Sequence, residues 1–242
     1  LSDMNVLEVY HRGKKIIKDE KVEIRPCDPQ LKNTVHLLGF RESDLCLPWR
    51  EGKVHILKML EGQIVTEDVQ EEVGYTEEKG RKVFKPDGTY QKIAAVERHK
   101  NTGKIGVGIV KGFGLRGGAI ASSVSHDSHN LIVIGDNDHD MYLAVQELLR
   151  TQGGYTLVEN GQVFDTLPLP IMGLMSDAGY EKVNEKLARM IPKAHEMGIP
   201  EGFDPFITLS FMALPVIPEI RITPRGVYLT QEDRMIQSPF DR

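Results

Sequence analysis

The chain of 242 residues has 40% hydrophobic and 27% charged residues and a formal net charge of -5. This is the composition of a globular protein, long enough for one or two domains. The negative charge, without any block of Lys or Arg, argues against a nucleic-acid partner.

The sequence also indicates the cellular setting. Its longest apolar run, residues 207–217, contains Pro215 and is about half as long as a membrane span requires, so we expect no membrane partner. Cys27 and Cys46 form neither a C-x-x-C pair nor a disulfide framework, which favours a cytoplasmic protein. There is no signal peptide, and the chain begins at Leu1 without a methionine. We therefore expect part of a longer protein.

The first ninety residues predict short strands and turns. Residues 6–10 and 14–17 flank an Arg-Gly pair typical of a hairpin, which residues 22–24 extend. Further strands are expected at residues 54–57 and 63–66. Residues 67–80 are acidic and predict a solvated connection. The Pro86-Asp87-Gly88 sequence predicts a turn.

After residue 90 the pattern becomes regular. Strands are expected at residues 92–97, 104–110, 119–125 and 130–134. A helix capped by residues 136–138 follows over residues 138–152, and Gly153-Gly154 ends it. Its apolar positions share one face: Met141, Ala144, Val145, Leu148 and Leu149. Residues 155–158 and 162–166 flank Asn160-Gly161, a strong hairpin signal.

A second helix is expected after Ser176 or Asp177, and Pro192 should kink or split it. An apolar stretch at residues 206–217, a strand at residues 220–223 and a polar tail complete the chain. Together these patterns predict an α+β fold in which two or three helices pack on a mostly antiparallel sheet.

Residues 112–135 contain the densest group of candidate functional residues. Five consecutive positions hold His126, Asp127, Ser128, His129 and Asn130. Two strand-like runs flank them, and polar loops on a rigid scaffold are where function concentrates. We expect these side chains to converge and to face the active site of a partner domain or a subunit interface. The alternative is a turn that only satisfies the backbone of the sheet. The further candidates for contact with substrate or interface are Ser125, Arg98 and His99.

Other interpretations of these residues are also open. Imidazole and carboxylate groups suit metals, so His126, Asp127 and His129 are candidate metal ligands. Ser125, His126 and Asp127 have the residue types of a hydrolase triad, but adjacent residues in a strand do not meet side by side. The turn from Arg98 to Lys100 is interpreted as solvated, or as a contact with an anion or another subunit.

Two further motifs favour structural roles. The Gly-Phe-Gly-Leu sequence at residues 112–115 lacks the Lys-Ser/Thr pair of a phosphate loop, which favours close backbone packing. The acidic residues at 136–140 lack the glycine and the distal glutamate of a calcium loop, which favours helix capping.

Several stretches together resemble a known family. RHKNTGKIGVGIVKGFGLRGGAIASSVSHDSHNLIVIGDNDHDM, Gly153-Gly154, PLPIMGLMSD and FMALPVIPEIRIT resemble the carboxy-terminal part of bacterial adenine deaminase. The resemblance implies three parts of the chain. Residues 91–242 would be the carboxy-terminal domain, residues 25–90 a connecting region, and residues 1–24 a remnant of the small β domain of the amidohydrolase superfamily.

The same resemblance implies a parent enzyme of purine salvage that hydrolyses the 6-amino group of adenine to give hypoxanthine and ammonia. In that family a divalent metal pair, Mn or Fe, activates water. The metal-binding barrel contains a His-x-His motif, which this chain lacks, as it lacks the H-x-E…P-C-x-x-C pattern of the zinc deaminases. We therefore expect the barrel to be absent and the fragment alone to be inactive.

Three partners follow from this interpretation: adenine, the barrel of the parent enzyme, and further copies of the chain in a homo-oligomer. Two other functions stay open. In the first, the chain is a non-catalytic oligomerisation module. In the second, it is an independent metal hydrolase that uses His126, Asp127 and His129.

Overall fold

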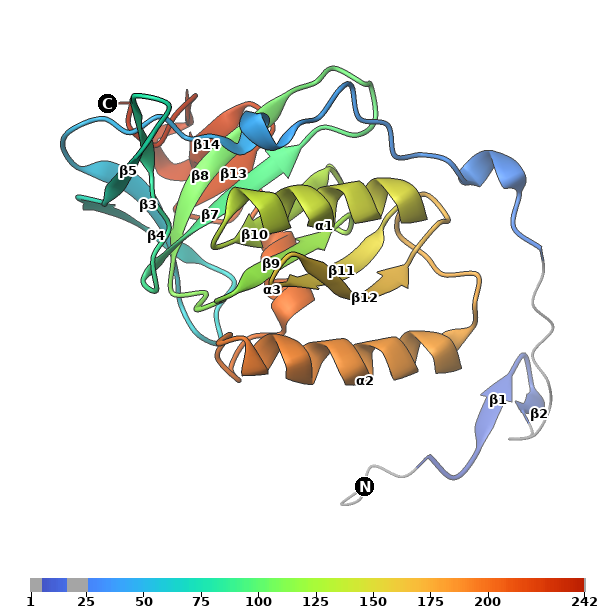
Figure 1. Cartoon of the computed structure of the whole chain (residues 1–242). Helices are drawn as coiled ribbons and strands as arrows, with labels where there is room; N and C mark the ends of the chain where they lie inside the picture. The colour runs from blue at the N-terminus through green and yellow to red at the C-terminus, as the bar shows by residue number, and fades with distance from the viewer. Residues whose placement is uncertain (1–5, 17–25, 242) are drawn as a thin grey trace.

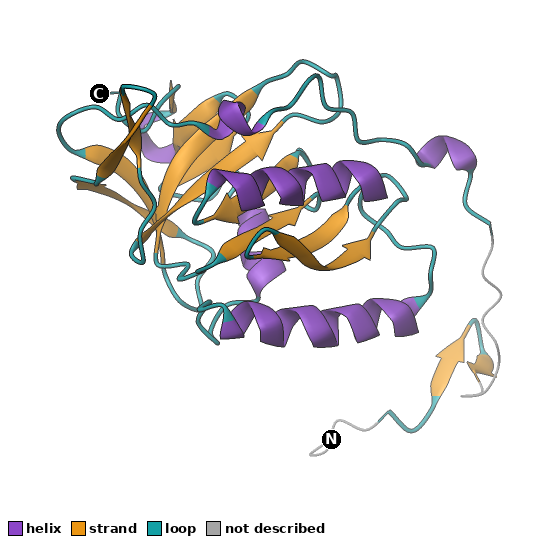
Figure 2. Cartoon of the chain, in the orientation of Figure 1, coloured by secondary structure: helices purple, strands orange, loops and turns teal. Residues whose placement is uncertain are grey.

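The computed structural model describes residues 6–16 and 26–241 (Figure 1). Eight strands form a central sheet in the order β12-β11-β9-β10-β7-β8-β3-β4. Figure 2 shows the strands in orange and the helices in purple. These strands are β3 (Val54–Met59), β4 (Thr66–Glu71), β7 (Tyr90–Val96), β8 (Ile105–Lys111), β9 (Gly118–Ser122), β10 (Leu131–Gly135), β11 (Gly154–Glu159) and β12 (Gln162–Pro168). Neighbouring strands are antiparallel, except that β3 and β8 are parallel.

Three α-helices and three small sheets accompany the central sheet in the described residues. The helices are α1 (Asp138–Thr151), α2 (Tyr180–Glu196) and α3 (Pro205–Phe211). The small sheets pair β1 (Val9–His11) with β2 (Lys14–Ile16), β5 (Tyr75–Glu78) with β6 (Arg81–Phe84), and β14 (Gly226–Leu229) with both β13 (Ile220–Thr223) and β15 (Arg234–Ile236). The predicted α+β class, with two or three helices packed on a mostly antiparallel sheet, is confirmed.

The central sheet is covered on both faces. Successive side chains of a strand point to opposite faces. Ile120 and Ile132 accordingly lie in the core beneath α2, α3 and β13–β15. Ala121 and Val133 lie in the core beneath α1. Burial on both sides explains why residues 131–134 are continuously apolar.

Local signals placed several elements correctly. The Asn137 side chain caps α1 by accepting from the Asp140 backbone N–H. The helix ends just before the predicted Gly153-Gly154 pair, although the left-handed residue that ends it is Gln152. Leu148 is fully buried, whereas Leu149 is half-buried. Asn160 and Gly161 turn the β11–β12 hairpin with positive φ angles of 48° and 80°, as an Asn-Gly turn requires.

Several boundaries differ from the prediction. The strand expected at residues 63–66 begins only at Thr66, and residues 67–80 contain most of β4 and all of β5 instead of a plain solvated connection. β4 lies at the edge of the sheet, so its polar side chains reach solvent and its sequence resembles a loop. In the tail expected to be plain and polar, β14 and β15 bury Leu229 and Ile236.

The second helix was also predicted imperfectly. α2 begins at Tyr180 after Gly179, without a side-chain cap, so neither Ser176 nor Asp177 caps it. The helix continues through Pro192 to Glu196. Pro192 removes one donor from the hydrogen-bond ladder, the N–H that would bond the Ala188 carbonyl, and the helix continues for four more residues.

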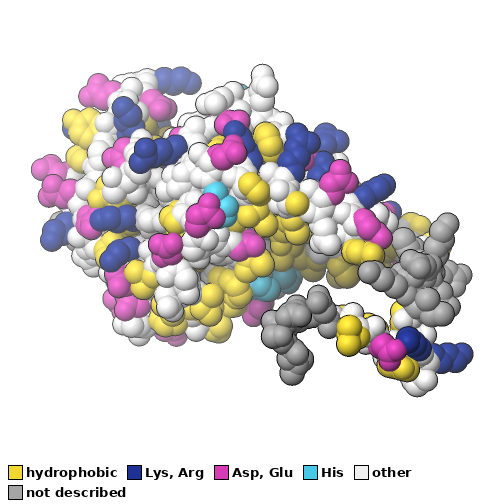
Figure 3. All heavy atoms as spheres, turned by 90° about the horizontal axis from the view of Figure 1, so that it is seen from below, with side chains coloured by type: hydrophobic (Ala, Val, Ile, Leu, Met, Phe, Trp, Pro, Cys, Tyr) yellow, Lys and Arg dark blue, Asp and Glu magenta, His cyan; other side chains and the backbone are white. Residues whose placement is uncertain are grey.

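The surface is mixed in character. From the side on which α2 lies, hydrophobic side chains are interspersed with charged groups (Figure 3). All six residues of β1 and β2 are exposed, and this hairpin stands apart from the rest of the chain in Figure 1. The extension expected at residues 22–24 lies outside the described residues. In the part of the chain that is described, no helix is both long and apolar enough to cross a membrane.

Candidate functional site

The central sheet has two ends with different chemistry. We call residues 97–99, 123–130 and 171–175 the turn end, and residues 112–118, 135–140 and 160–161 the glycine end. β9 runs from the glycine end to the turn end, and β10 returns antiparallel to it. Residues 112–135, which carry most of the candidate residues, therefore run from the glycine end to the turn end and back.

Arg98 holds the turn end together from inside. Its side chain is only 1% exposed. Nε donates to the His129 carbonyl, while the two terminal nitrogens donate to the carbonyls of Thr34 and Met172, each at 3.0 Å. Burial lowers the pKa of Arg98 to about 10. The interpretation of residues 98–100 as a solvated turn is therefore wrong for Arg98, although His99 and Lys100 are exposed.

Unusual backbone conformations accompany these contacts. His129 and Met172, whose carbonyls accept from Arg98, have positive φ angles of 50° and 58°. Such a conformation costs about 1–2 kcal/mol in a residue with a side chain and persists only where neighbours impose it. Gly173 has a φ of 71°, and a Cβ there would lie 2.9 Å from an Arg98 nitrogen. Arg98 thus fixes the conformation of two separate loops.

The two imidazoles of the turn lie close together beside α3. The ring centroids of His126 and His129 are 5.8 Å apart, and that of His126 is 4.9 Å from Phe211. The His126 backbone N–H donates to the Ser210 carbonyl at 3.1 Å. The expected convergence of side chains is thus present for the histidine pair.

The other candidates of the turn differ in exposure and bonding. Asn130 is buried: its Oδ1 accepts from the Arg98 N–H at 3.3 Å, and its Nδ2 donates to Ser128 Oγ at 3.1 Å. His99 Nε2 lies 2.7 Å from the Ser128 carbonyl. Asp127 and Ser128 are exposed. The turn thus presents a carboxylate and a hydroxyl outward while its amide is used internally.

Two buried polar atoms of the turn are unsatisfied. Ser125 Oγ and His129 Nδ1 have no hydrogen-bond partner among the described residues. Burial lowers the pKa of His129, and the neighbouring His126 and Arg98 lower it further. A His129 with a lowered pKa is neutral at pH 7 and offers one nitrogen as an acceptor. A buried polar atom without a partner calls for an explanation, and a functional contact is one.

Two interpretations of the turn gain no support from this arrangement. No group of three or more His, Cys, Asp or Glu side chains in residues 6–16 and 26–241 is placed to hold a metal ion. The metal role of His126, Asp127 and His129 is therefore still only a prediction. Since Ser125 Oγ is unpartnered, it does not show the hydrogen bond to a base that activates a serine nucleophile.

At the glycine end the backbone amides are already occupied. The N–H groups of Gly117 and Gly118 donate to the Asp136 carboxylate at 2.5 and 3.1 Å. The Gly161 N–H donates to Asp140 at 2.8 Å. A Cβ on Gly114 would lie 2.5 Å from the Gly198 carbonyl. These glycines serve close packing, and no phosphate is needed to satisfy their amides.

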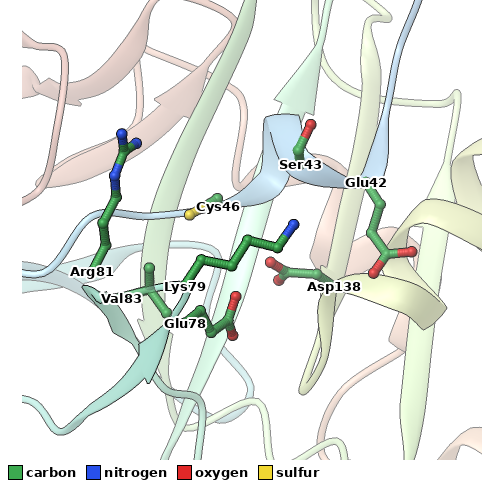
Figure 4. Close-up of a pocket in the computed structure, with 8 residues that line it drawn as sticks. All are labelled: Glu42, Ser43, Cys46, Glu78, Lys79, Arg81, Val83 and Asp138. Carbon is green, nitrogen blue, oxygen red and sulfur yellow. The ribbon is translucent and has the colours of Figure 1, made fainter.

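A cavity of about 680 Å³ lies beside the start of α1 (Figure 4). In Figure 4 the Lys79 side chain extends toward Asp138, and Arg81 points away. Asp138 pairs with Lys92, and Glu42 lies 3.0 Å from His139 Nδ1. Burial raises the pKa of Cys46 and therefore disfavours its reactive thiolate. No side chain that lines this cavity leaves a buried polar atom unsatisfied among the described residues. The turn end does leave such atoms, so it is the better candidate site.

Sequence patterns missed part of the turn end. These missed residues come from three segments that the sequence did not connect with the turn: Thr34, Gly173, and the neighbouring pair Ser210 and Phe211 of α3. Gly173 alone left a signal, because a glycine between bulky residues indicates a close approach or a positive φ.

The chain is thus an α+β domain with a histidine-bearing turn fixed to the end of its sheet by a buried arginine. Residues 63–234 match the family model described as the adenine deaminase C-terminal domain. The chain belongs to this family.

Proteins named adenine deaminase are similar along almost the whole chain. That of Desulfitobacterium hafniense (strain Y51) is 49% identical over 237 residues, which cover 98% of this chain and 41% of the relative. That of Nitratidesulfovibrio vulgaris (strain DP4) is 41% identical over 232 residues, which cover 94% and 40%. That of Clostridium acetobutylicum is 40% identical over 235 residues, with the same two shares. The chain thus spans about 40% of the length of these relatives.

Proposed function

We propose that this chain is the carboxy-terminal portion of an adenine deaminase, which converts adenine and water to hypoxanthine and ammonia in purine salvage. The family match and the relatives' names support this proposal. The parent enzyme would be cytoplasmic and would use Mn or Fe. Since the described residues gather no three-ligand set, the proposal assigns those ions to residues outside this chain.

In the same proposal the turn end faces the mouth of the parent's active site or a subunit interface. The observation that carries it is the pair of unsatisfied buried atoms, Ser125 Oγ and His129 Nδ1, beside a histidine pair on a rigid scaffold. Desolvated polar groups held in fixed positions are suited to orient a reacting group or a partner side chain.

Exposed apolar side chains nearby favour a docking role for this part of the molecule. Ile207 on α3 is 52% exposed, as is Met175, and Tyr180 at the start of α2 is 70% exposed. The proposed contacts are with the parent's barrel and with further copies of the chain. The proposed division into residues 1–24, 25–90 and 91–242 describes the same parent.

A chimera tests the proposal. The part of the Desulfitobacterium hafniense relative that precedes its match to this chain is joined to the start of this chain. Ammonia release from adenine is then measured. We expect the chimera to deaminate adenine and the chain alone to release no ammonia, with or without Mn²⁺. Deamination by the chain alone would instead favour an independent hydrolase.

Substitutions in the chimera test the role of the turn. His126→Ala and His129→Ala should lower kcat/KM by about tenfold, equivalent to about 1.4 kcal/mol of barrier, while the melting temperature changes little. His139→Ala, at an exposed histidine in the first turn of α1, is the matched control and should change neither quantity. If the two turn variants melt early and retain full activity, the turn has only a structural role. A Mn²⁺-dependent rise in melting temperature that both variants abolish would indicate metal binding at the turn.

A further inference from the structure

Two of the motifs that carry the family resemblance meet at a second, smaller cavity of about 310 Å³. Asp127 and Asn130 border it from the turn end. Ala213 and Ile222 belong to the stretch that follows α3, and Ala95 contributes the wall from β7. The cavity therefore exists only because the turn and the post-α3 stretch fold against the same strand.

The walls of this cavity are apolar and rigid. Ala95, Ala213 and Ile222 are 1%, 6% and 0% exposed and belong to the core beneath α3. Ala95 lies in the middle of the sheet, paired with Gly106 on β8 and Ile132 on β10. The volume of the cavity and its mostly apolar lining, with a few polar groups at the border, are typical of small-molecule sites.

Four polar side chains line the cavity, and among the described residues only that of Asp127 forms no hydrogen bond. The Asn130 amide is used by Arg98 and Ser128. The Thr223 hydroxyl donates to the Gly226 carbonyl at 3.0 Å. Asp127 forms no ion pair among those found in residues 6–16 and 26–241. A free carboxylate beside an apolar cavity selects a ligand with N–H donors on an apolar body.

The lining also excludes a class of ligand. None of the lining residues is basic, and Asp127 itself repels anions. A phosphate group would enter without a cation to pair with it. The chemistry therefore favours an uncharged base over a nucleotide.

We propose that this cavity binds a planar nitrogen heterocycle through its exocyclic amino group, which donates hydrogen bonds to the Asp127 carboxylate. The identity of that heterocycle as an aminopurine free base rests on the proposed function. Asp127 then has a different role from the histidine pair of the same turn: it recognises the amino group of a bound base.

Binding to the 242-residue chain tests this proposal. Adenine, purine without the amino group, and adenosine monophosphate are titrated by calorimetry, and methyl NMR signals of Ala95, Ala213 and Ile222 report the location. We expect adenine to bind and to shift these signals. Purine and the nucleotide should bind at least about tenfold more weakly, because a hydrogen bond to a charged group is lost or an unpaired phosphate is introduced.

Two variants and a control sharpen the result. Asp127→Asn should weaken adenine binding by about tenfold or more, and Ala213→Val should abolish it by filling the cavity. Glu201→Gln, at a carboxylate that is 89% exposed, should leave binding unchanged. Equal binding of adenine and purine, equal binding of the nucleotide, or an unchanged affinity of Asp127→Asn would overturn the proposal.

The outcome is separable from the proposed function. If the chimera deaminates adenine and the chain alone binds none, this cavity is not a site for the base, and the proposed function stands. If the chain binds adenine through Asp127 and the chimera is inactive, the assignment of the cavity as a binding site is supported and the proposed function is contradicted.

Discussion

The two ends of the central sheet use opposite charges to organise their backbone. At the turn end a buried cation, Arg98, collects carbonyls from three loops. At the glycine end two carboxylates, Asp136 and Asp140, collect amide N–H groups. In the described structure every buried side-chain polar atom of the glycine end is satisfied, whereas the turn end leaves Ser125 Oγ and His129 Nδ1 without partners. The buried polar groups of the glycine end are thus used up by the fold. The turn end keeps two buried atoms that can form a hydrogen bond to a ligand or a partner.

Removing the Arg98 cation should have the largest effect on stability. Arg98→Met deprives three backbone carbonyls of their donor, and each unsatisfied buried group costs about 1–3 kcal/mol. We expect the free energy of unfolding to fall by about 3 kcal/mol or more in urea titrations. Arg41→Met is the control, because the Arg41 side chain is 77% exposed. A loss for Arg98→Met as small as that of the control would show that Arg98 does not hold the turn end.

Glycine substitutions compare the two ends directly. Gly161 at the glycine end and Gly173 at the turn end have φ angles of 80° and 71°, so alanine costs about 1–2 kcal/mol of backbone strain at either position. A Cβ at Gly161 meets nothing within 4 Å, whereas one at Gly173 meets the Arg98 guanidinium at 2.9 Å. Gly173→Ala should therefore lower the melting temperature more than Gly161→Ala. Equal losses would mean that the guanidinium moves aside freely.

Removing an anion from the glycine end should affect stability alone. Asp136→Ala leaves the N–H groups of Gly117 and Gly118 without their acceptor, which costs about 1–3 kcal/mol of unfolding free energy. In the adenine deaminase chimera, kcat/KM should stay unchanged. Asp177→Ala, which breaks an exposed pair with Lys32, should change stability by no more than about 1 kcal/mol. A loss of activity in folded Asp136→Ala would contradict a purely structural glycine end.

The smallest effect should appear as a pH dependence at the turn end. Burial raises the pKa of Glu97, but hydrogen bonds from the backbone N–H groups of Thr102, Lys100 and His99 outweigh it and lower the pKa to about 2 from an ordinary 4.5. The resulting stability is complete above pH 4.5 and is lost as the pH falls toward 2.

The measurement compares the wild type with Glu97→Gln. The wild-type advantage in unfolding free energy should shrink between pH 5 and pH 2, a window set by the ordinary value of 4.5 and the lowered value of about 2. Glu201→Gln should show no such change. A constant difference across this window would mean that the backbone N–H groups do not favour the ionised Glu97.

Sequence patterns predicted the elements whose signals are local. The α1 stripe, the Asn160-Gly161 hairpin and the strands around residues 92–134 follow from periodicity and turn chemistry. Edge strands such as β4 were missed because one side of an edge strand is free to be polar. β14 and β15 were missed because only distant packing makes them strands.

The candidate site was predicted only in part. The polar turn was evident from five adjacent residues. The position of Arg98 was not, because its burial depends on carbonyls from residues 34, 129 and 172. Long-range contacts of this kind leave no periodic trace in the sequence.

The way in which β13 and β14 cover β8 has a consequence for biosynthesis. A Cβ on Gly106 would lie 2.0 Å from the Thr223 carbonyl, so this part of β8 is shaped to be covered by residues made more than a hundred positions later. The His55 N–H likewise donates to the Pro239 carbonyl at 2.9 Å. On the ribosome, a nascent chain must release residues up to Ile236 before β13–β15 can cover this face, and up to Pro239 before β3 has its last backbone contact. Until then its apolar strands are a substrate for chaperones and a hazard for aggregation.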